Sequence, residues 1–447
     1  MKKAQWMALL LMLLSTGTSL LLGLVIDRAV PGRGLDLQVI YYGTRCIIQH
    51  HDPYQIDDLR EIYSSEERRL PPGSIAPPQS VIWLYYLPTV FIVIAPLSML
   101  PWWSAYTLWM TLLFGGVIVT SFLLWKVGSD YAPRVALFLI CLLLSNMEIG
   151  FTLANPSVLV ISLCIMAVWC FINDRFVLVG TLCLASGLAI KPHDAGLVWL
   201  YFLLAGGVQL KRAVQTLAIV VAIGLLSITW VSQVSPHWIQ EWHSNVSAIS
   251  AHGGFADPGP DAELHSVVID LQAEISVFWD DPHIYNTLSY IVCGSLLIIW
   301  AFATLRSPFS KMRAWFALAA VVPVAMLVTY HRLYDTKLLL LTVPACTMLW
   351  AQGGKKRWVA LAMTAAGFTL AGDLSCVFLQ ILADSLHVST VGLGEKLLTL
   401  TLLRPVPIVL LAMAVFYLWV YVHSTSSRSS LLQDKSTDFT ANSTVSS

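Results

Sequence analysis

An acidic residue, Asp36, follows the first long apolar run of the chain, just past a Pro-Gly-Arg-Gly turn. A carboxylate at the mouth of a bundle of membrane helices is costly, and such residues usually mark a functional site. A carboxylate in this position can take the proton from a reacting hydroxyl as a general base. We therefore take Asp36 as the candidate catalytic residue. Alternatively, Asp36 caps the helix expected over residues 36–50, which would not exclude catalysis.

Two later motifs carry basic residues beside polar ones, Lys191-Pro192-His193-Asp194 and His331-Arg332-Leu333-Tyr334-Asp335. Lysine offers a point charge and arginine a bidentate fork, and both suit an anion such as phosphate. Such cations stabilise the charge that develops on a departing phosphate. Lys191, His331 and Arg332 are therefore the candidate ligands of a donor phosphate. Alternatively, their side chains extend to lipid headgroups at the membrane surface.

Further polar residues are candidates for substrate contacts: Tyr41, Asp52, Tyr54, Asn155 and Gln272. Each also has a structural interpretation. Asp52 precedes a proline and is typical of a turn, and Tyr54 can pack its loop against the membrane surface. Asn155 can cap the helix that follows it. Gln272 can satisfy backbone groups in its loop.

The composition indicates an all-α polytopic membrane protein. Of the 447 residues, 57% are hydrophobic and only 12% are charged, with a mean hydropathy of +0.72. The apolar residues form blocks of about 17–25, each long enough to cross a bilayer. The net charge of +0 offers no basic surface for nucleic acid. Neither the eight cysteines nor the histidines show the spacing of a compact metal site, so we expect no metal and no cofactor.

The apolar runs predict about twelve transmembrane helices, over residues 5–26, 102–125, 133–149, 156–172, 176–190, 195–210, 213–233, 287–305, 314–330, 336–351, 358–382 and 404–422. The run 81–100 is also apolar, but prolines break it. If this run does not cross the membrane, most of the basic clusters fall on the same side as Lys2 and Lys3, as the positive-inside rule favours. We therefore expect 81–100 to be a re-entrant or interfacial element.

This topology places both termini in the cytoplasm and two large loops outside. The first outer loop, 27–101, contains Asp36, and the second is 235–286. Residues 1–422 form one transmembrane domain. The segment 423–447 is rich in serine and threonine and has few large apolar residues, so we expect a disordered cytoplasmic tail. Lys191 and Arg332 are the main basic residues that this topology leaves outside, against the positive-inside rule. Binding of an anion at the outer leaflet would explain why they are there.

Motifs in the order expected of one enzyme family run through most of residues 1–350. They are Asp36 with Tyr41-Tyr42, Asp52-Pro53-Tyr54, Tyr86-Leu87-Pro88, Ala95-Pro96-Leu97, Leu100-Pro101, Lys191-Pro192 and His331-Arg332-Leu333-Tyr334-Asp335. Together they resemble family 87 of the glycosyltransferases, which has the GT-C fold and includes polyprenol-phosphate-mannose-dependent α-mannosyltransferases. The chain departs from the family pattern at His50-His51, at Leu153-Ala154 and in lacking a second proline after Pro88.

The resemblance implies Asp36 as the catalytic base of an inverting transfer that uses no nucleotide. The expected enzyme is a hexosyltransferase that moves a hexose, mannose by default, from a polyprenyl-phosphate donor to a hydroxyl of a glycan or glycolipid. An outer-face site in the plasma membrane fits a lipid-linked donor, because nucleotide sugars are cytoplasmic. The expected partners are this donor, the acceptor and membrane lipids. A transporter or lipid flippase is the alternative, and it predicts ionisable residues deep in the spans.

Overall fold

The computed structural model describes residues 3–29, 34–68, 83–260, 262, 265–386 and 392–443. Within these ranges every regular element is a helix, and the only β pairing is an isolated antiparallel bridge between Val268 and Arg332. Seven helices are long and apolar enough to cross a membrane: α1 (Lys3–Ala29), α5 (Trp102–Ser129), α8 (Pro156–Asn173), α11 (Gly207–Ser232), α14 (Pro282–Leu305), α15 (Lys311–Val328) and α20 (Pro405–Ser443). The prediction of an all-α polytopic membrane protein is confirmed.

The structure differs from the expected twelve spans in the length and continuity of its helices. The described residues hold seven candidate spans, or eight if α17 (Gly354–Leu370) and α18 (Asp373–Ser385), which are bent by 72°, count as one. The other expected spans correspond to shorter helices, namely α6 (Pro133–Leu144), α9 (Val177–Ile190), α10 (Pro192–Leu204) and α16 (Val343–Gln352). The region expected as 336–351 begins as the 3₁₀ helix η2 (Leu333–Thr342). Hydropathy detects apolar runs, but it does not detect breaks within them.

Within the described part of the apolar run, residues 83–100, there is one short helix, α4 (Thr89–Ser98), of ten residues. At about 1.5 Å per residue it is about 15 Å long, half of a hydrocarbon core of about 30 Å. Pro96 lies inside α4, and Pro101 separates it from α5. The Thr89 hydroxyl donates to the carbonyl of Ala189 at the end of α9, 2.6 Å away. This short helix fits the expected re-entrant or interfacial element.

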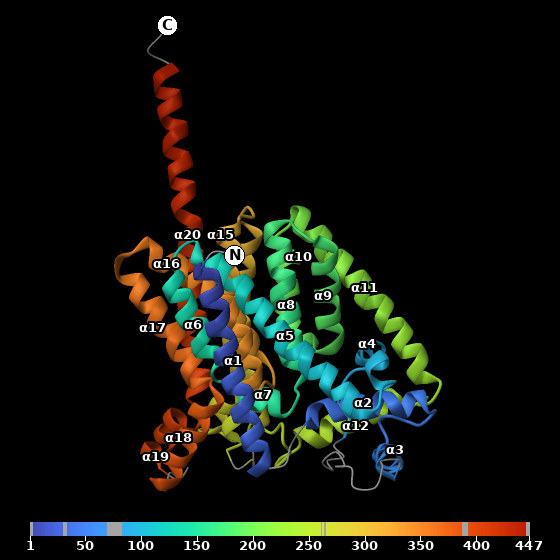
Figure 1. The fold of residues 1–447 in the computed structure, drawn as a ribbon. Helices are drawn as coiled ribbons and strands as arrows, with labels where there is room; N and C mark the ends of the chain where they lie inside the picture. The colour runs from blue at the N-terminus through green and yellow to red at the C-terminus, as the bar shows by residue number, and fades with distance from the viewer. Residues whose placement is uncertain are drawn as a thin grey trace.

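The start of α1 and the end of α20 lie at the same end of the helix bundle (Figure 1). At the opposite end lie α2 (Leu35–Ile48), α3 (Ile56–Arg68) and α12 (Trp238–Ser250). α20 continues as a helix through Ser443 and so enters the segment 423–447. The disorder that the composition favours for this segment stays a prediction. The arrangement puts the two expected outer loops together, away from the termini.

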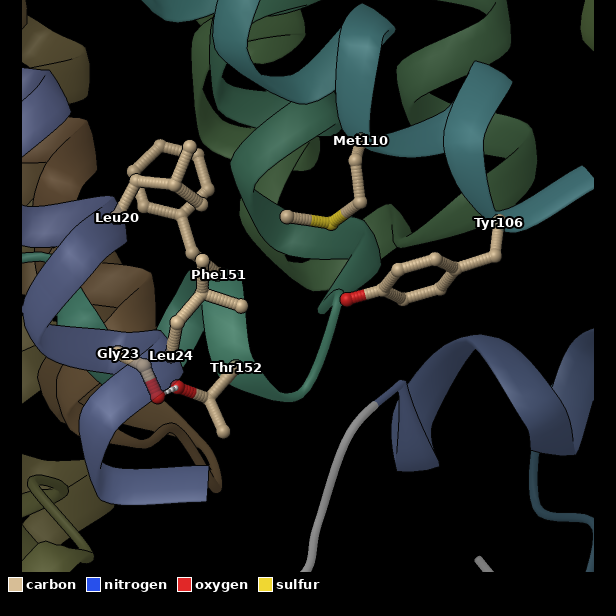
Figure 2. Close-up of a pocket in the computed structure, with 7 residues that line it drawn as sticks. All are labelled: Leu20, Gly23, Leu24, Tyr106, Met110, Phe151 and Thr152. Atoms are coloured by element: carbon tan, nitrogen blue, oxygen red, sulfur yellow. Dashed lines mark hydrogen bonds between the residues drawn. The ribbon is translucent and has the colours of Figure 1, made fainter. Parts of the chain in front are cut away.

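The short helix α7 (Glu148–Thr152) is fixed against α1. The Thr152 hydroxyl donates to the carbonyl of Gly23, 3.0 Å away, across a small hollow between α1, α5 and α7 (Figure 2). A Cβ atom at Gly23 would lie 2.9 Å from the carbonyl oxygen of Glu148, so glycine permits this close approach. α7 leads directly to the loop against which α2 begins.

A buried ionisable cluster also holds α7, and it includes a lysine that the sequence analysis did not single out. Lys337, Asp373 and Glu148 are each at most 1% exposed. The Lys337 ammonium lies 3.7 Å from Asp373 Oδ1 and donates to the carbonyl of Ala371 at 3.1 Å. Asp373 Oδ2 accepts from the amide of Ile149 in α7 at 2.7 Å. The cluster therefore ties α7 to η2 and to the bend before α18.

The start of α2 rests on the loop after α7. Gly34 adopts the left-handed conformation, with φ of 72°, and its amide donates to the carbonyl of Thr152 at 2.8 Å. The amide of Asp36 donates to the carbonyl of Leu153 at 3.1 Å. A side chain is strained at positive φ, which favours glycine at position 34. These contacts fix the position of Asp36 relative to the loop 152–155.

Arg404 joins the second outer loop to the start of α20. It is 1% exposed, and its guanidinium donates to the carbonyls of Pro258 at 3.0 Å and Gly259 at 2.9 Å, and to that of Ala273. Arg404→Ala should lower the thermal unfolding midpoint by several degrees, because each carbonyl left buried without a partner costs about 1–3 kcal/mol. The measurement is unfolding in detergent, with Arg175→Ala, at an exposed position, as the control. Equal midpoints for both variants would contradict this role.

Candidate active site

Asp36 and Asn155 form the first contact of the candidate site. Asn155 Nδ2 donates to Asp36 Oδ2 at 2.5 Å, while Asn155 Oδ1 accepts from the amide of Ser157 at 2.8 Å and caps α8. Asn155 is buried, whereas Asp36 is only partly buried. The N-cap of α2 is Gly34, not Asp36. The Asp36 carboxylate is therefore held from the side by an amide and does not cap its own helix.

Lys191 lies at the centre of a buried polar network between α9, α8 and η2. Its ammonium lies 3.0 Å from Asp335 Oδ1 and also donates to the hydroxyl of Ser157. The Ser157 hydroxyl donates to the same oxygen of Asp335 at 2.5 Å. A second carboxylate oxygen, Asp194 Oδ2, lies 3.6 Å from the ammonium. Two carboxylates therefore surround Lys191, which is 6% exposed.

His331 and Arg332 border this network. His331 Nε2 is 3.3 Å from Asp194 Oδ1, and Nδ1 is 2.9 Å from the carbonyl oxygen of Thr329. Arg332 is partly exposed, and its guanidinium donates to the carbonyl of Phe255 at 2.7 Å and lies over the Phe255 ring. Arg332 Nε has no hydrogen-bond partner among the described residues. Of the three predicted phosphate ligands, Arg332 has the most donor capacity left.

The charges of this cluster act on Asp36. Burial raises the pKa of Asp36, while the hydrogen bond from Asn155 and the positive charges of Arg332 and Lys191 oppose the rise. Burial lowers the pKa of His331, but the bond to Asp194 and the charge of Asp335 outweigh it, so the net shift is upward. The cluster brings three aspartates, Asp36, Asp194 and Asp335, together with two cations, Lys191 and Arg332. The predicted base and the predicted phosphate ligands thus belong to one electrostatic unit.

Aromatic side chains line the same region. Tyr85 and Tyr86 stack with ring centroids 4.8 Å apart, and Tyr85 meets Phe255 edge-on at 5.9 Å. Burial is the main cause that raises the pKa of Tyr85 and Tyr86, and the negative charge of Asp36 raises both further. The Trp242 indole of α12 donates to the carbonyl of Tyr85 at 2.9 Å. The segments around Tyr85 and Trp242, which belong to the two loops expected outside, therefore meet in this region.

Four of the predicted substrate residues make contacts within the protein, and among the described residues none of these contacts reaches Asp36; their role in substrate binding stays a prediction. The Tyr41 hydroxyl donates to the carbonyl of Leu100 at 2.7 Å. Asp52 Oδ1 accepts from the amide of Tyr54 at 2.8 Å, which is the contact expected if Asp52 forms a turn. Burial raises the pKa of Asp52 to about 6. The Tyr54 hydroxyl donates to the carbonyl of Tyr86 at 3.0 Å, and the Gln272 amide to that of Val328 at 3.1 Å.

Three side chains in the network could hold a divalent cation. The ligand atoms of His193, Asp194 and His331 all lie within 4.8 Å of one another. The two histidines are far apart in the sequence, so spacing along the chain could not reveal this group. The Lys191 ammonium already lies 3.6 Å from the same aspartate and supplies a positive charge.

Sequence reasoning missed Ser157, Asp194 and Asp335 as members of the site. A signal was present, because each of the two cations, Lys191 and Arg332, is followed by an aspartate three residues later. The structure adds a contact between the two motifs, in which Asp335 meets Lys191 and Asp194 meets His331.

Asp335→Asn tests the network. The substitution removes the negative charge that Lys191 and Ser157 contact, and a broken buried ion pair typically costs about 3–5 kcal/mol. We expect a clearly lower midpoint of thermal unfolding in detergent. Asp130→Asn, at an exposed position, is the matched control. If both variants unfold at the wild-type temperature, the network does not stabilise the fold.

Comparison with known proteins gives one match. The model of glycosyltransferase family 87 matches residues 83–329, which include Asn155 and Lys191 but not Asp36 or Arg332. Searches of curated proteins and of solved structures returned no match. Because the family match extends over more than half of the chain, and the helices fit a multi-pass membrane protein, this protein belongs to glycosyltransferase family 87 and is a membrane glycosyltransferase.

Proposed function

We propose that the protein transfers a hexose, mannose by default, from a polyprenyl-phosphate donor to an acceptor hydroxyl of a glycan or glycolipid. The observation that carries this proposal is the Asp36 carboxylate, held by Asn155 at 2.5 Å and subject to the charges of Arg332 and Lys191. A base beside cations is what a hydroxyl needs to displace a phosphate. No part of this chemistry needs a nucleotide.

In the proposed reaction, Asp36 accepts the proton of the acceptor hydroxyl as its oxygen attacks the anomeric carbon. The bond between that carbon and the phosphate oxygen breaks, and its electron pair leaves with the polyprenyl phosphate. A single displacement inverts the configuration at the sugar carbon. The upward pKa shift of Asp36 makes it a stronger base than an exposed aspartate, provided that it remains ionised at the working pH.

On the donor side, we assign the direct phosphate contact to Arg332. Its side chain is partly exposed, and its guanidinium donates to the carbonyl of Phe255 through Nη2. Lys191 is buried and already surrounded by Asp335, Asp194 and Ser157. Lys191 and His331 then contribute positive charge to the site without contacting the phosphate directly. Arginine suits this position because its planar fork binds two phosphate oxygens.

We place the reaction at the outer face of the plasma membrane. The charge distribution of the sequence favours cytoplasmic termini, and Figure 1 has both ends of the chain opposite α2 and α12. Asp36 lies in α2. A site on that side is out of reach of cytoplasmic nucleotide sugars, so the sugar must arrive on a lipid.

A transporter or lipid flippase remains the second candidate, and the buried cluster of Lys337, Asp373 and Glu148 is the observation that favours it. Ionisable residues inside a membrane bundle often mark a transport path. In this protein, however, Asp373 accepts from the backbone of Ile149, and Lys337 donates to that of Ala371. These contacts fix α7 and the bend before α18, which is a structural role.

Asp36→Asn should abolish transfer while leaving the fold intact, because an amide cannot accept the proton. General-base catalysis is worth about 10²–10⁴-fold. The measurement is release of polyprenyl phosphate by protein in nanodiscs, given polyprenyl-phosphate-linked mannose, glucose or arabinose and a membrane lipid extract as acceptor source. Asp57→Asn, at an exposed position of α3, is the matched control. Transfer retained in Asp36→Asn would rule out its role, and no turnover of any donor by wild type would favour transport.

The reaction should lose activity at low pH. A base works only when deprotonated, so kcat/KM falls as the pH drops through the pKa of Asp36, which lies above its ordinary value of 3.8. The bond from Asn155 lowers this pKa, so Asn155→Ala should move the acid limb to higher pH. The measurement is kcat/KM against pH for both proteins. An acid limb at the same pH in both would show that this bond does not tune the base.

A further inference from the structure

The two carboxylate oxygens of Asp194 face different neighbours. Oδ2 faces the ammonium of Lys191 at 3.6 Å. Oδ1 faces two imidazole rings, with His331 Nε2 at 3.3 Å and His193 Nε2 at 3.7 Å. The two rings meet edge to face, with their centroids 5.0 Å apart. The Oδ1 side of Asp194 is therefore a second environment, separate from the ion pair with Lys191.

A backbone contact decides which nitrogen of His331 is available on that side. His331 Nδ1 lies 2.9 Å from the carbonyl oxygen of Thr329, and a carbonyl oxygen can only accept, so Nδ1 carries a proton. In the neutral ring the lone pair is then on Nε2, which faces Asp194 Oδ1. A lone pair and a carboxylate oxygen repel each other at this distance, so a positive species, a proton or a metal ion, must lie between them.

The spacing of the three side chains fits a transition-metal ion. Ligand atoms that lie about 2.0–2.1 Å from a tetrahedral zinc ion are about 3.4 Å from one another. The distances from Asp194 Oδ1 to the two imidazoles, 3.3 Å and 3.7 Å, agree with this value. In the part of the chain that the structure describes, this is the one group of three such ligands close enough to share an ion.

Burial gives the group two fixed members and one accessible member. The side chains of His331 and Asp194 are 1% and 2% exposed, whereas that of His193 is 37% exposed. The bond from Nδ1 to a backbone carbonyl orients the His331 ring in the way that is usual for metal-binding histidines. An ion can therefore enter past His193 and keep coordination positions open on that side.

We propose that His193, Asp194 and His331 bind a zinc ion whose open coordination positions take oxygens of the donor phosphate. The ion site is argued from the geometry of these residues, whereas its contact with a phosphate rests on the proposed function. Two imidazoles and one carboxylate suit zinc, while magnesium prefers oxygen ligands. The ion takes the place of the proton on His331 Nε2, because a ligating imidazole is neutral.

A zinc ion in this position adds to the charge that Arg332 presents. His331 directly precedes Arg332 in the chain, so the ion and the guanidinium belong to the same short segment. The ion supplies two positive charges where an imidazolium supplies one, and it stabilises the charge that develops on a phosphate oxygen as a Lewis acid. The bonds that form and break in the transfer stay the same, and Asp36 still accepts the proton of the acceptor hydroxyl.

Zinc binding is tested without any donor. Tag-free protein in nanodiscs is treated with a chelator and titrated with Zn²⁺ by calorimetry, and the absorption spectrum of added Co²⁺ reports on nitrogen and oxygen ligands. His193→Gln removes the exposed imidazole and leaves the buried network in place. His283→Gln, at an exposed histidine in the first turn of α14, is the matched control.

We expect one zinc ion per chain in wild type and in His283→Gln. Loss of a partner that merely orients a ligand costs about 10–100-fold in metal affinity, so the Kd of His193→Gln should rise at least about tenfold. Zinc should raise the unfolding midpoint of wild type but not that of His193→Gln, and the two should unfold alike without zinc. Equal affinity in His193→Gln, or no bound ion in wild type, would overturn the site and leave a proton between His331 and Asp194.

Release of polyprenyl phosphate, measured in parallel with and without zinc, separates this inference from the proposed function. Wild type that binds zinc and turns over the donor faster with it supports both. Wild type that binds zinc but consumes no donor keeps the ion site and loses the proposed donor. Wild type that turns over the donor equally well after chelation loses the contact between ion and phosphate, while the proposed function stands.

Discussion

The attraction between the buried ammonium of Lys191 and the carboxylate of Asp335 is the interaction on which the rest of the site depends. In a medium of low dielectric constant such a pair is strong, and either partner is costly alone. Lys191 lies between α9 and α10, Asp335 lies in the first turn of η2, and Ser157, which contacts both, lies in the first turn of α8. One pair therefore fixes three segments at the end of the bundle where the outer loops meet.

Asp36 reaches this assembly through backbone contacts rather than through charge alone. The amides of Gly34 and Asp36 bond to the loop after α7, and Asn155 ends that loop by capping α8. The same Asn155 side chain bonds to the Asp36 carboxylate. The position of the proposed base is thus set by the fold of the loop 152–155, which α1 and the Lys337 cluster hold from behind.

The sequence was sufficient to predict the fold class, and it directed attention to Asp36, Asn155 and the cations that the structure brings together. It could not predict which cation meets which carboxylate. Both motifs place an aspartate three residues after a cation, but the pair of Lys191 with Asp335 and that of His331 with Asp194 join segments that are far apart in the sequence and arise only in the folded protein. Tyr41 and Gln272 stay predicted substrate residues; their side chains donate to the backbone carbonyls of Leu100 and Val328, partners that the sequence does not reveal.

The two motifs that carry the paired charges are synthesised at different times. Lys191 leaves the ribosome and enters the membrane long before Asp335 exists, and an uncompensated ammonium in a bilayer is unfavourable. Asp194, three residues away and 3.6 Å from the ammonium in the folded protein, is the counter-ion available during that interval. Lys191 therefore gains a second carboxylate, that of Asp335, when η2 packs in place, while Asp194 stays beside the ammonium.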